Sequence, residues 1–180
     1  MLQITIPKTE MWDEINGRFI YVKEQTLQLE HSLVSISKWE SKWHKPFLSK
    51  EEKTNEETID YIRCMTLTRN VNPEVYNYLT RENFMQINAY IEDPMTATTF
   101  SKDNSSKRSR EIVTSELIYY WMLTLTIPPE YEKWHLNRLL TLIRVCNVKN
   151  TPPKRRGKRE LASERAALNA SRRARYNTKG

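Results

Sequence analysis

The first thirty residues alternate between apolar and polar positions. Leu2, Ile4 and Ile6 are separated by polar residues, and a second alternation of this kind runs over residues 26–30. A period of two is typical of a strand that buries one face. Asn16-Gly17, which lies directly before an apolar run, is a strong turn signal. We therefore predict a small antiparallel β-meander with strands near residues 2–6, 18–23 and 26–30.

Beyond residue 31 the apolar residues recur every three or four positions, which is the period of an α-helix. The starts of the helices are marked by residues that cap a first turn. Thr54 with Glu57 matches a capping box, and Asn72 precedes a proline that suits the first helical position. The predicted helices cover residues 32–44, 55–68, a short segment from Asn72, the segment between Thr80 and Pro94, 109–126 and 132–148.

The most apolar stretch of the chain, residues 118–127, covers the second half of the helix predicted over 109–126. It is too short to cross a bilayer, which takes about 20 apolar residues. A helix that is apolar nearly all round is typical of the interior of a domain. We therefore predict that this helix lies at the centre of the core.

These patterns together predict an α+β, mostly α-helical fold. An N-terminal β-meander over residues 1–30 packs on a helical body over residues 31–150, and the two form one domain. A stretch with two prolines after residue 150 ends this body. Residues 151–180 then form a basic tail, which we expect to be flexible or partly helical.

Charge divides the chain in the same place. The whole chain has 29 Lys+Arg against 22 Asp+Glu, a formal net charge of +7. Residues 1–150 hold 19 basic and 20 acidic side chains, a net −1, whereas residues 151–180 hold 10 basic and 2 acidic, a net +8. Basic residues at this density are candidates for contact with phosphates. The candidate polyanion-binding residues are Lys154, Arg155, Arg156, Lys158, Arg159, Arg165, Arg172, Arg173 and Arg175. Three interpretations of the tail stay open: non-specific nucleic-acid contact, an acidic protein partner, or a solubilising extension.

No pattern in the chain indicates a catalytic, cofactor or metal site. With only three glycines, neither a dinucleotide-binding G-x-G-x-x-G nor a P-loop can be formed. Cys64 and Cys146 are too few for a disulfide framework, and we expect both thiols to be buried. The histidines and cysteines show no metal-ligand spacing. The N-terminal residues lack the pattern of a signal peptide, so we expect a cytosolic protein.

Aromatic residues make up 10% of the chain. Most of them are expected to build the core. Tryptophan and tyrosine are also favoured at the centres of protein interfaces, so some of them are candidates for an exposed groove that holds a partner segment. The candidate partner-binding residues are Trp39, Trp43, Tyr119, Trp121 and Trp134.

Five sequence segments, spread over nearly the whole chain, carry a family resemblance. They are SLVSISKWESKW at residues 32–43, DYIRCMT at 60–66, SELIYYWM at 115–122, WHLNRLLTLI at 134–143 and AALNASRR at 166–173. These segments resemble the tail assembly chaperones of long-tailed, siphovirus-type bacteriophages. The family pattern assigns no binding residue, so none is carried over to this chain.

The resemblance implies a non-enzymatic protein in the cytoplasm of the bacterial host. Such chaperones bind the tape measure protein, assist assembly of the tail tube and are absent from the finished virion. Two alternatives stay open: a structural tail or head–tail joining component that is retained in the virion, and a nucleic-acid-associated phage protein that acts through its basic tail. The edge strands of the predicted meander favour a homo-oligomer. We expect no cofactor and no membrane contact.

Overall fold

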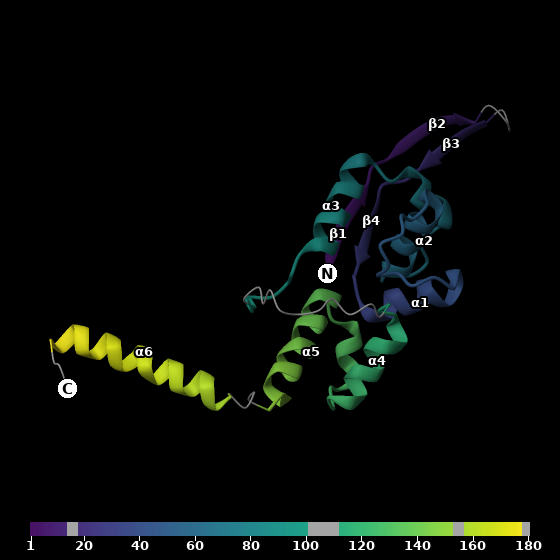
Figure 1. Cartoon of the computed structure of the whole chain (residues 1–180). Coiled ribbons are helices and arrows are strands. Elements are labelled where there is room, and N and C mark those ends of the chain that lie inside the picture. Colours follow the sequence, from purple (N-terminus) through teal and green to yellow (C-terminus); the bar gives the residue numbers. More distant parts are fainter. Residues whose placement is uncertain (14–17, 101–111, 153–156, 178–180) are drawn as a thin grey trace. The chain divides into compact units, whose positions relative to one another are not determined.

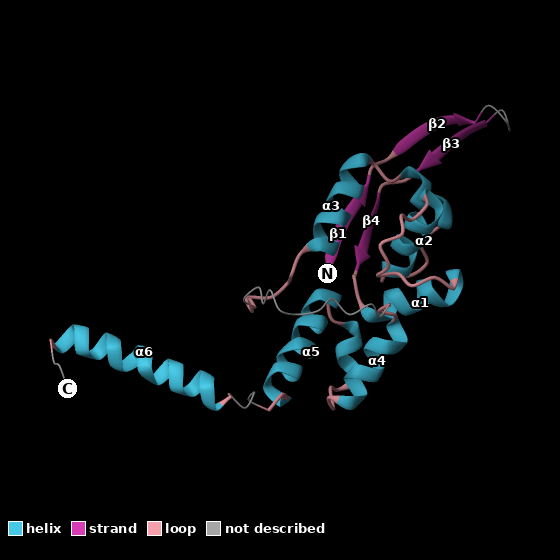
Figure 2. Cartoon of the chain, in the orientation of Figure 1, coloured by secondary structure: helices cyan, strands magenta, loops and turns pink. Residues whose placement is uncertain are grey.

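A computed structural model describes residues 1–13, 18–100, 112–152 and 157–177. The chain divides into two compact units, Met1–Asn147 and Val148–Gly180 (Figure 1). Among the residues that the structure describes, far more belong to helices than to strands (Figure 2). These proportions confirm the prediction of an α+β, mostly helical fold.

The strands form one long antiparallel hairpin. They are β1 (Leu2–Ile6), β2 (Thr9–Asp13), β3 (Arg18–Val22) and β4 (Gln25–Leu29). β1 pairs with β4, and β2 pairs with β3. Ile6 lies opposite Gln25 and Thr9 opposite Val22, so both ladders keep the same register across a short break. Figure 1 shows the β2–β3 end of this hairpin projecting beyond the neighbouring helices.

The predicted meander is wrong in its connections, because β4 pairs with β1 and not with β3. Ile4 lies opposite Leu27, and both side chains are buried, so this pairing gives the two alternating segments a shared apolar face. The ladder breaks at Pro7, which has no N–H to donate. β2 was not predicted because Met11 and Trp12 are adjacent, which removes the period of two.

The helices are α1 (Leu33–Trp43), α2 (Asn55–Met65), the 3₁₀ helix η1 (Pro73–Tyr78), α3 (Arg81–Glu92), α4 (Ser115–Thr124), the 3₁₀ helix η2 (Pro129–Lys133), α5 (Leu136–Asn150) and α6 (Lys158–Tyr176). α2, η1 and α3 begin where the sequence places their caps, whereas α5 begins at Leu136 and not at residue 132. The hydroxyl of Thr54 accepts a hydrogen bond from the N–H of Glu57, whose carboxylate accepts from the N–H of Thr54. This confirms the predicted capping box.

α2 ends three residues before the predicted boundary because the following segment pairs with β4. The N–H of Leu67 donates to the carbonyl of Gln28, and Thr66 forms a bridge with Leu29. α3 lies along the other strand of the hairpin, where the amide of Asn83 donates to the carbonyl of Thr5. Both edges of the β1–β4 ladder are therefore contacted by other segments, and its apolar face belongs to the core.

The core of the first unit is formed by the apolar face of β1 and β4 together with one face of each surrounding helix. Its fully buried members are Ile4, Ile6, Leu27, Leu29, Leu33, Ile36, Trp39, Ile62, Met65, Ile87, Ile118, Leu136 and Leu139. They come from segments far apart in the sequence, so they are brought together only by the fold.

The prediction of α4 as the central core helix is wrong. Ile118 and Met122 are buried, whereas Tyr120 is 61% exposed and Leu123 is 79% exposed. α4 therefore lies at the surface of the first unit and buries one face only. It begins at Ser115, and residues 101–111, where the helix was predicted to start, lie outside the described residues.

Candidate partner-binding surface

α4 is held to the body by a buried carboxylate at its N-terminus. Glu40, at the end of α1, accepts a hydrogen bond from the N–H of Ser115 at 2.7 Å and another from the N–H of Phe47 at 2.7 Å. The acceptor is a carboxylate, so both hydrogen bonds are charge-assisted. Glu40 is only 7% exposed, so water is largely excluded from them. The negative charge also lies at the positive end of the helix dipole. The start of α4 is thus fixed to α1.

Beyond the exposed Glu116 in its first turn, the outward face of α4 carries apolar side chains. Tyr120 and Leu123 are exposed, and Leu117 and Trp121 beside them are half-buried. No charged residue occurs in the sequence from Leu117 to Pro129. We call the four residues Leu117, Tyr120, Trp121 and Leu123 the α4 face. Exposed apolar side chains grouped in this way are typical of a binding site for an apolar partner segment.

Trp39 was predicted as a partner-binding residue, and the structure contradicts this. Its side chain is 1% exposed, and its Nε1–H donates to the carbonyl of Glu57 at 2.9 Å. Phe47 packs edge-on against its ring at a centroid distance of 5.2 Å. Because its ring is packed and its Nε1–H is hydrogen-bonded within the fold, Trp39 is a core residue.

The other predicted aromatic residues are half-buried, and three of them make specific contacts within the first unit. Trp43 donates from Nε1 to the carboxylate of Asp60, and Tyr119 donates to Glu132. Burial, together with that hydrogen bond, raises the pKa of Tyr119 to about 12. Trp134 stacks on Tyr131 and is covered by the guanidinium of Arg138. Of the predicted aromatic residues, Trp121 is the one that belongs to the α4 face.

Tyr120 and Leu123 were missed by the sequence analysis. The spacing of α4 places Ile118 and Met122 on one face and Tyr120 and Leu123 on the opposite side. A stretch that is apolar on every side gives no indication of which face is buried. Only the contact between α1 and α4, anchored by Glu40, selects it.

The predicted polyanion-binding residues lie in the second unit. Lys154, Arg155 and Arg156 are outside the described residues. The remaining six, from Lys158 to Arg175, fall within α6. Every α6 residue whose burial is described is exposed.

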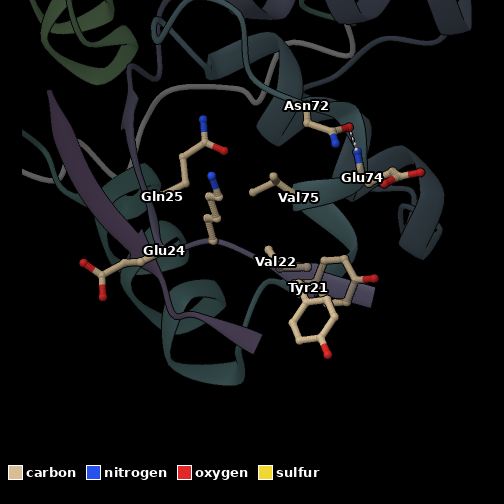
Figure 3. A pocket seen from close by; sticks show the side chains of 9 residues that line it. Tyr21, Val22, Glu24, Gln25, Asn72, Glu74 and Val75 are labelled. Atoms are coloured by element: carbon tan, nitrogen blue, oxygen red, sulfur yellow. Dashed lines mark hydrogen bonds between the residues drawn. The ribbon is translucent and has the colours of Figure 1, made fainter. Parts of the chain in front are cut away.

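A cleft of about 510 Å³ lies between the β3–β4 link and η1 (Figure 3). Val22 and Val75 are buried side chains in its wall, and Tyr21 and Glu24 extend from opposite ends of the link. Its lining residues are Tyr21, Val22, Lys23, Glu24, Gln25, Asn72, Glu74, Val75 and Tyr78. This lining suits an apolar side chain flanked by polar groups.

His31 and His135 form a buried pair with ring centroids 5.1 Å apart. His31 shares a hydrogen bond with the hydroxyl of Tyr61, and Nε2 of His135 donates to the carbonyl of Tyr90 at 2.9 Å. Burial, followed by repulsion from His135, lowers the pKa of His31 to about 3. The carbonyl of His31 also accepts from the N–H of Leu136. The pair is therefore neutral at physiological pH and joins the end of β4 to the start of α5.

Both cysteines are half-buried rather than buried. Burial raises the pKa of the Cys64 thiol, with a further contribution from Asp60. Within the described ranges, no group of three or more His, Cys, Asp and Glu side chains is placed to hold a metal ion. No helix among the described residues is long and apolar enough to cross a membrane.

Searches of protein families, curated proteins and solved structures find no match to the chain.

Proposed function

We propose that the protein is a non-enzymatic tail assembly chaperone of a long-tailed bacteriophage. In this proposal the α4 face binds amphipathic helical segments of the tape measure protein while the tail tube assembles. The observation that supports the proposal is the exposure of Tyr120 and Leu123 on α4, in a stretch from Leu117 to Pro129 that contains no charged residue. The family resemblance of five sequence segments supplies the identity of the partner.

The chemistry of the α4 face suits a partner helix. An amphipathic helix presents apolar side chains every three or four residues, and a complementary apolar surface removes them from water. Tyr120 and Leu123 are three residues apart, and Leu117 and Trp121 extend the same surface along the helix. Because the N-terminus of α4 is already fixed by Glu40, α4 loses little conformational entropy on binding.

The proposal is tested by co-expressing the chain with the tape measure protein of the same phage. The variant Leu123→Glu places a charge at the most exposed position of the α4 face. A matched control is Met85→Glu, since Met85 is 64% exposed on α3 and carries the same change outside the α4 face. We expect Leu123→Glu to lower recovery of the complex at least tenfold and Met85→Glu to leave it unchanged.

Two results would contradict the proposal. One is equal recovery of the tape measure protein with the wild-type chain and with Leu123→Glu. The other is an equal loss with Met85→Glu, which would mean that any added surface charge has this effect. Circular dichroism of both variants serves as the folding control, because a charge at an exposed position is expected to leave the helices intact.

A further inference from the structure

α6 is a 19-residue helix that contains five arginines. Arg165 and Arg172 are seven residues apart, which is two turns, and therefore lie on one line along the helix. Arg173 and Arg175 lie on either side of this line. Ala167 and other small residues occupy the opposite side. Arg165, Arg172, Arg173 and Arg175 are exposed, so the C-terminal half of α6 presents a basic face.

The composition of α6 favours a polyphosphate over a protein surface as the partner. Protein interfaces need an apolar centre from which charge is depleted, and Leu168 is the one large aliphatic residue of α6 whose exposure is described. Binding to a phosphate backbone needs no such centre, because counterion release supplies the free energy. Arginine rather than lysine dominates the basic face, and its guanidinium fork matches a phosphate with two hydrogen bonds.

We propose that α6 binds the sugar–phosphate backbone of double-stranded DNA, without sequence preference. Arg165 and Arg175 are separated by about 15 Å along the helix axis at 1.5 Å per residue. Duplex DNA carries roughly one charge per 1.7 Å of its axis, so each arginine on the basic face meets a phosphate along this length. The major groove of B-form DNA is wide enough to admit an α-helix.

The test measures binding of the full chain to a fluorescent DNA duplex of random sequence over a range of salt concentrations. The variant changes Arg165, Arg172 and Arg173 to glutamine, which keeps helix propensity and removes three charges. The matched control changes Arg69, Arg81 and Lys133 to glutamine, because these side chains are exposed in the first unit. A second variant changes Arg165, Arg172 and Arg173 to lysine and so keeps the charge.

We expect the α6 glutamine variant to reduce the slope of log affinity against log salt by about 2–3, since each phosphate contact contributes about 0.9. The control is expected to keep the wild-type slope, and the lysine variant to retain most of it. Equal losses in the α6 variant and the control would overturn the proposal, because net charge alone would then explain binding. Absence of DNA binding by the wild-type chain would also overturn it.

Polyglutamate serves as a competitor that represents an acidic protein surface. We expect it to displace the duplex much less effectively than unlabelled DNA at the same concentration of charge. Equal displacement would overturn the proposal in favour of an acidic protein partner. Neither outcome depends on the tape measure protein, so this test is independent of the proposed chaperone function.

Discussion

His31 shows how burial controls the charge of a single residue. Its ring lies between Phe47, Tyr61 and His135, and it is 2% exposed. An ordinary histidine has a pKa near 6.5, and burial followed by the neighbouring imidazole lowers that of His31 to about 3. The pKa of His135 is also lowered, mainly by burial. The fold thus holds two neutral imidazoles in contact.

This pair predicts that the free energy of unfolding falls as the pH drops below about 6.5. The unfolded chain takes up protons at both histidines in that range, while the folded chain does not bind one at His31 until about pH 3. Each such group lowers stability by at most about 1.4 kcal/mol per pH unit. Urea unfolding at about pH 7 and about pH 5.5 measures the change before most carboxylates titrate.

The control for this prediction is His31→Asn, which keeps a hydrogen-bonding group towards Tyr61 and cannot titrate in this range. We expect a smaller loss of stability between the two pH values than in the wild-type chain, with the remaining loss due to His135. An unchanged loss in His31→Asn would contradict the assignment. The absolute stability of the variant does not matter here, because only its dependence on pH is compared.

At the scale of secondary-structure elements, local signals and long-range contacts differ in what they reveal. The starts of α1, α2 and α3 follow from Ser32, Thr54 and Thr80, whose hydroxyls accept hydrogen bonds from N–H groups three residues ahead. These caps are local, and the sequence predicted those at Thr54 and Thr80 but not the one at Ser32. The pairing of β4 with β1 joins residues 19 to 27 positions apart, and a period of two does not specify the partner strand.

The hairpin has two functionally different halves. The β1–β4 half supplies Ile4, Ile6, Leu27 and Leu29 to the core, while β2 and β3 contact mainly each other. We predict that replacing residues 7–24 by Asn-Gly leaves a unit that still unfolds cooperatively, because a two-residue turn keeps Ile6 opposite Gln25. The expected cost is about 2 kcal/mol, mainly from lost burial of Val22. Thermal unfolding by circular dichroism measures it.

A broad, non-cooperative transition in this shortened variant would contradict the assignment of β2 and β3 as an appendage of the core. A useful comparison is Leu27→Ala, which keeps the hairpin length but removes a fully buried side chain. It is expected to cost more, about 2–5 kcal/mol.

At the scale of the whole molecule, the sequence predicted the mostly helical α+β class but not the surface that we propose for binding. An apolar run such as residues 118–127 suggests burial on all sides. The fold instead buries one side of α4 through Glu40, which is 75 residues from its partner Ser115. Composition alone does not reveal a bond of that kind. The caps at Thr54 and Thr80 were predictable, whereas the exposed face of α4 was not.

The division of charge along the chain also has a consequence at this scale. Residues 1–150 carry a net −1 and residues 151–180 a net +8, so the α4 face and the basic face of α6 suit different kinds of partner. An uncharged face binds through apolar contact, which changes little with salt. A basic helix binds through counterion release, which weakens steeply with salt.

Amide hydrogen exchange of the full chain, alone and with the tape measure protein, tests the central claim most directly. We predict that slower exchange on binding is concentrated in α4, from Ser115 to Thr124, and persists when the salt concentration is raised. The variant Leu123→Glu is expected to abolish this protection. Protection confined to α6, or no protection of α4 in a complex that still forms, would contradict the account.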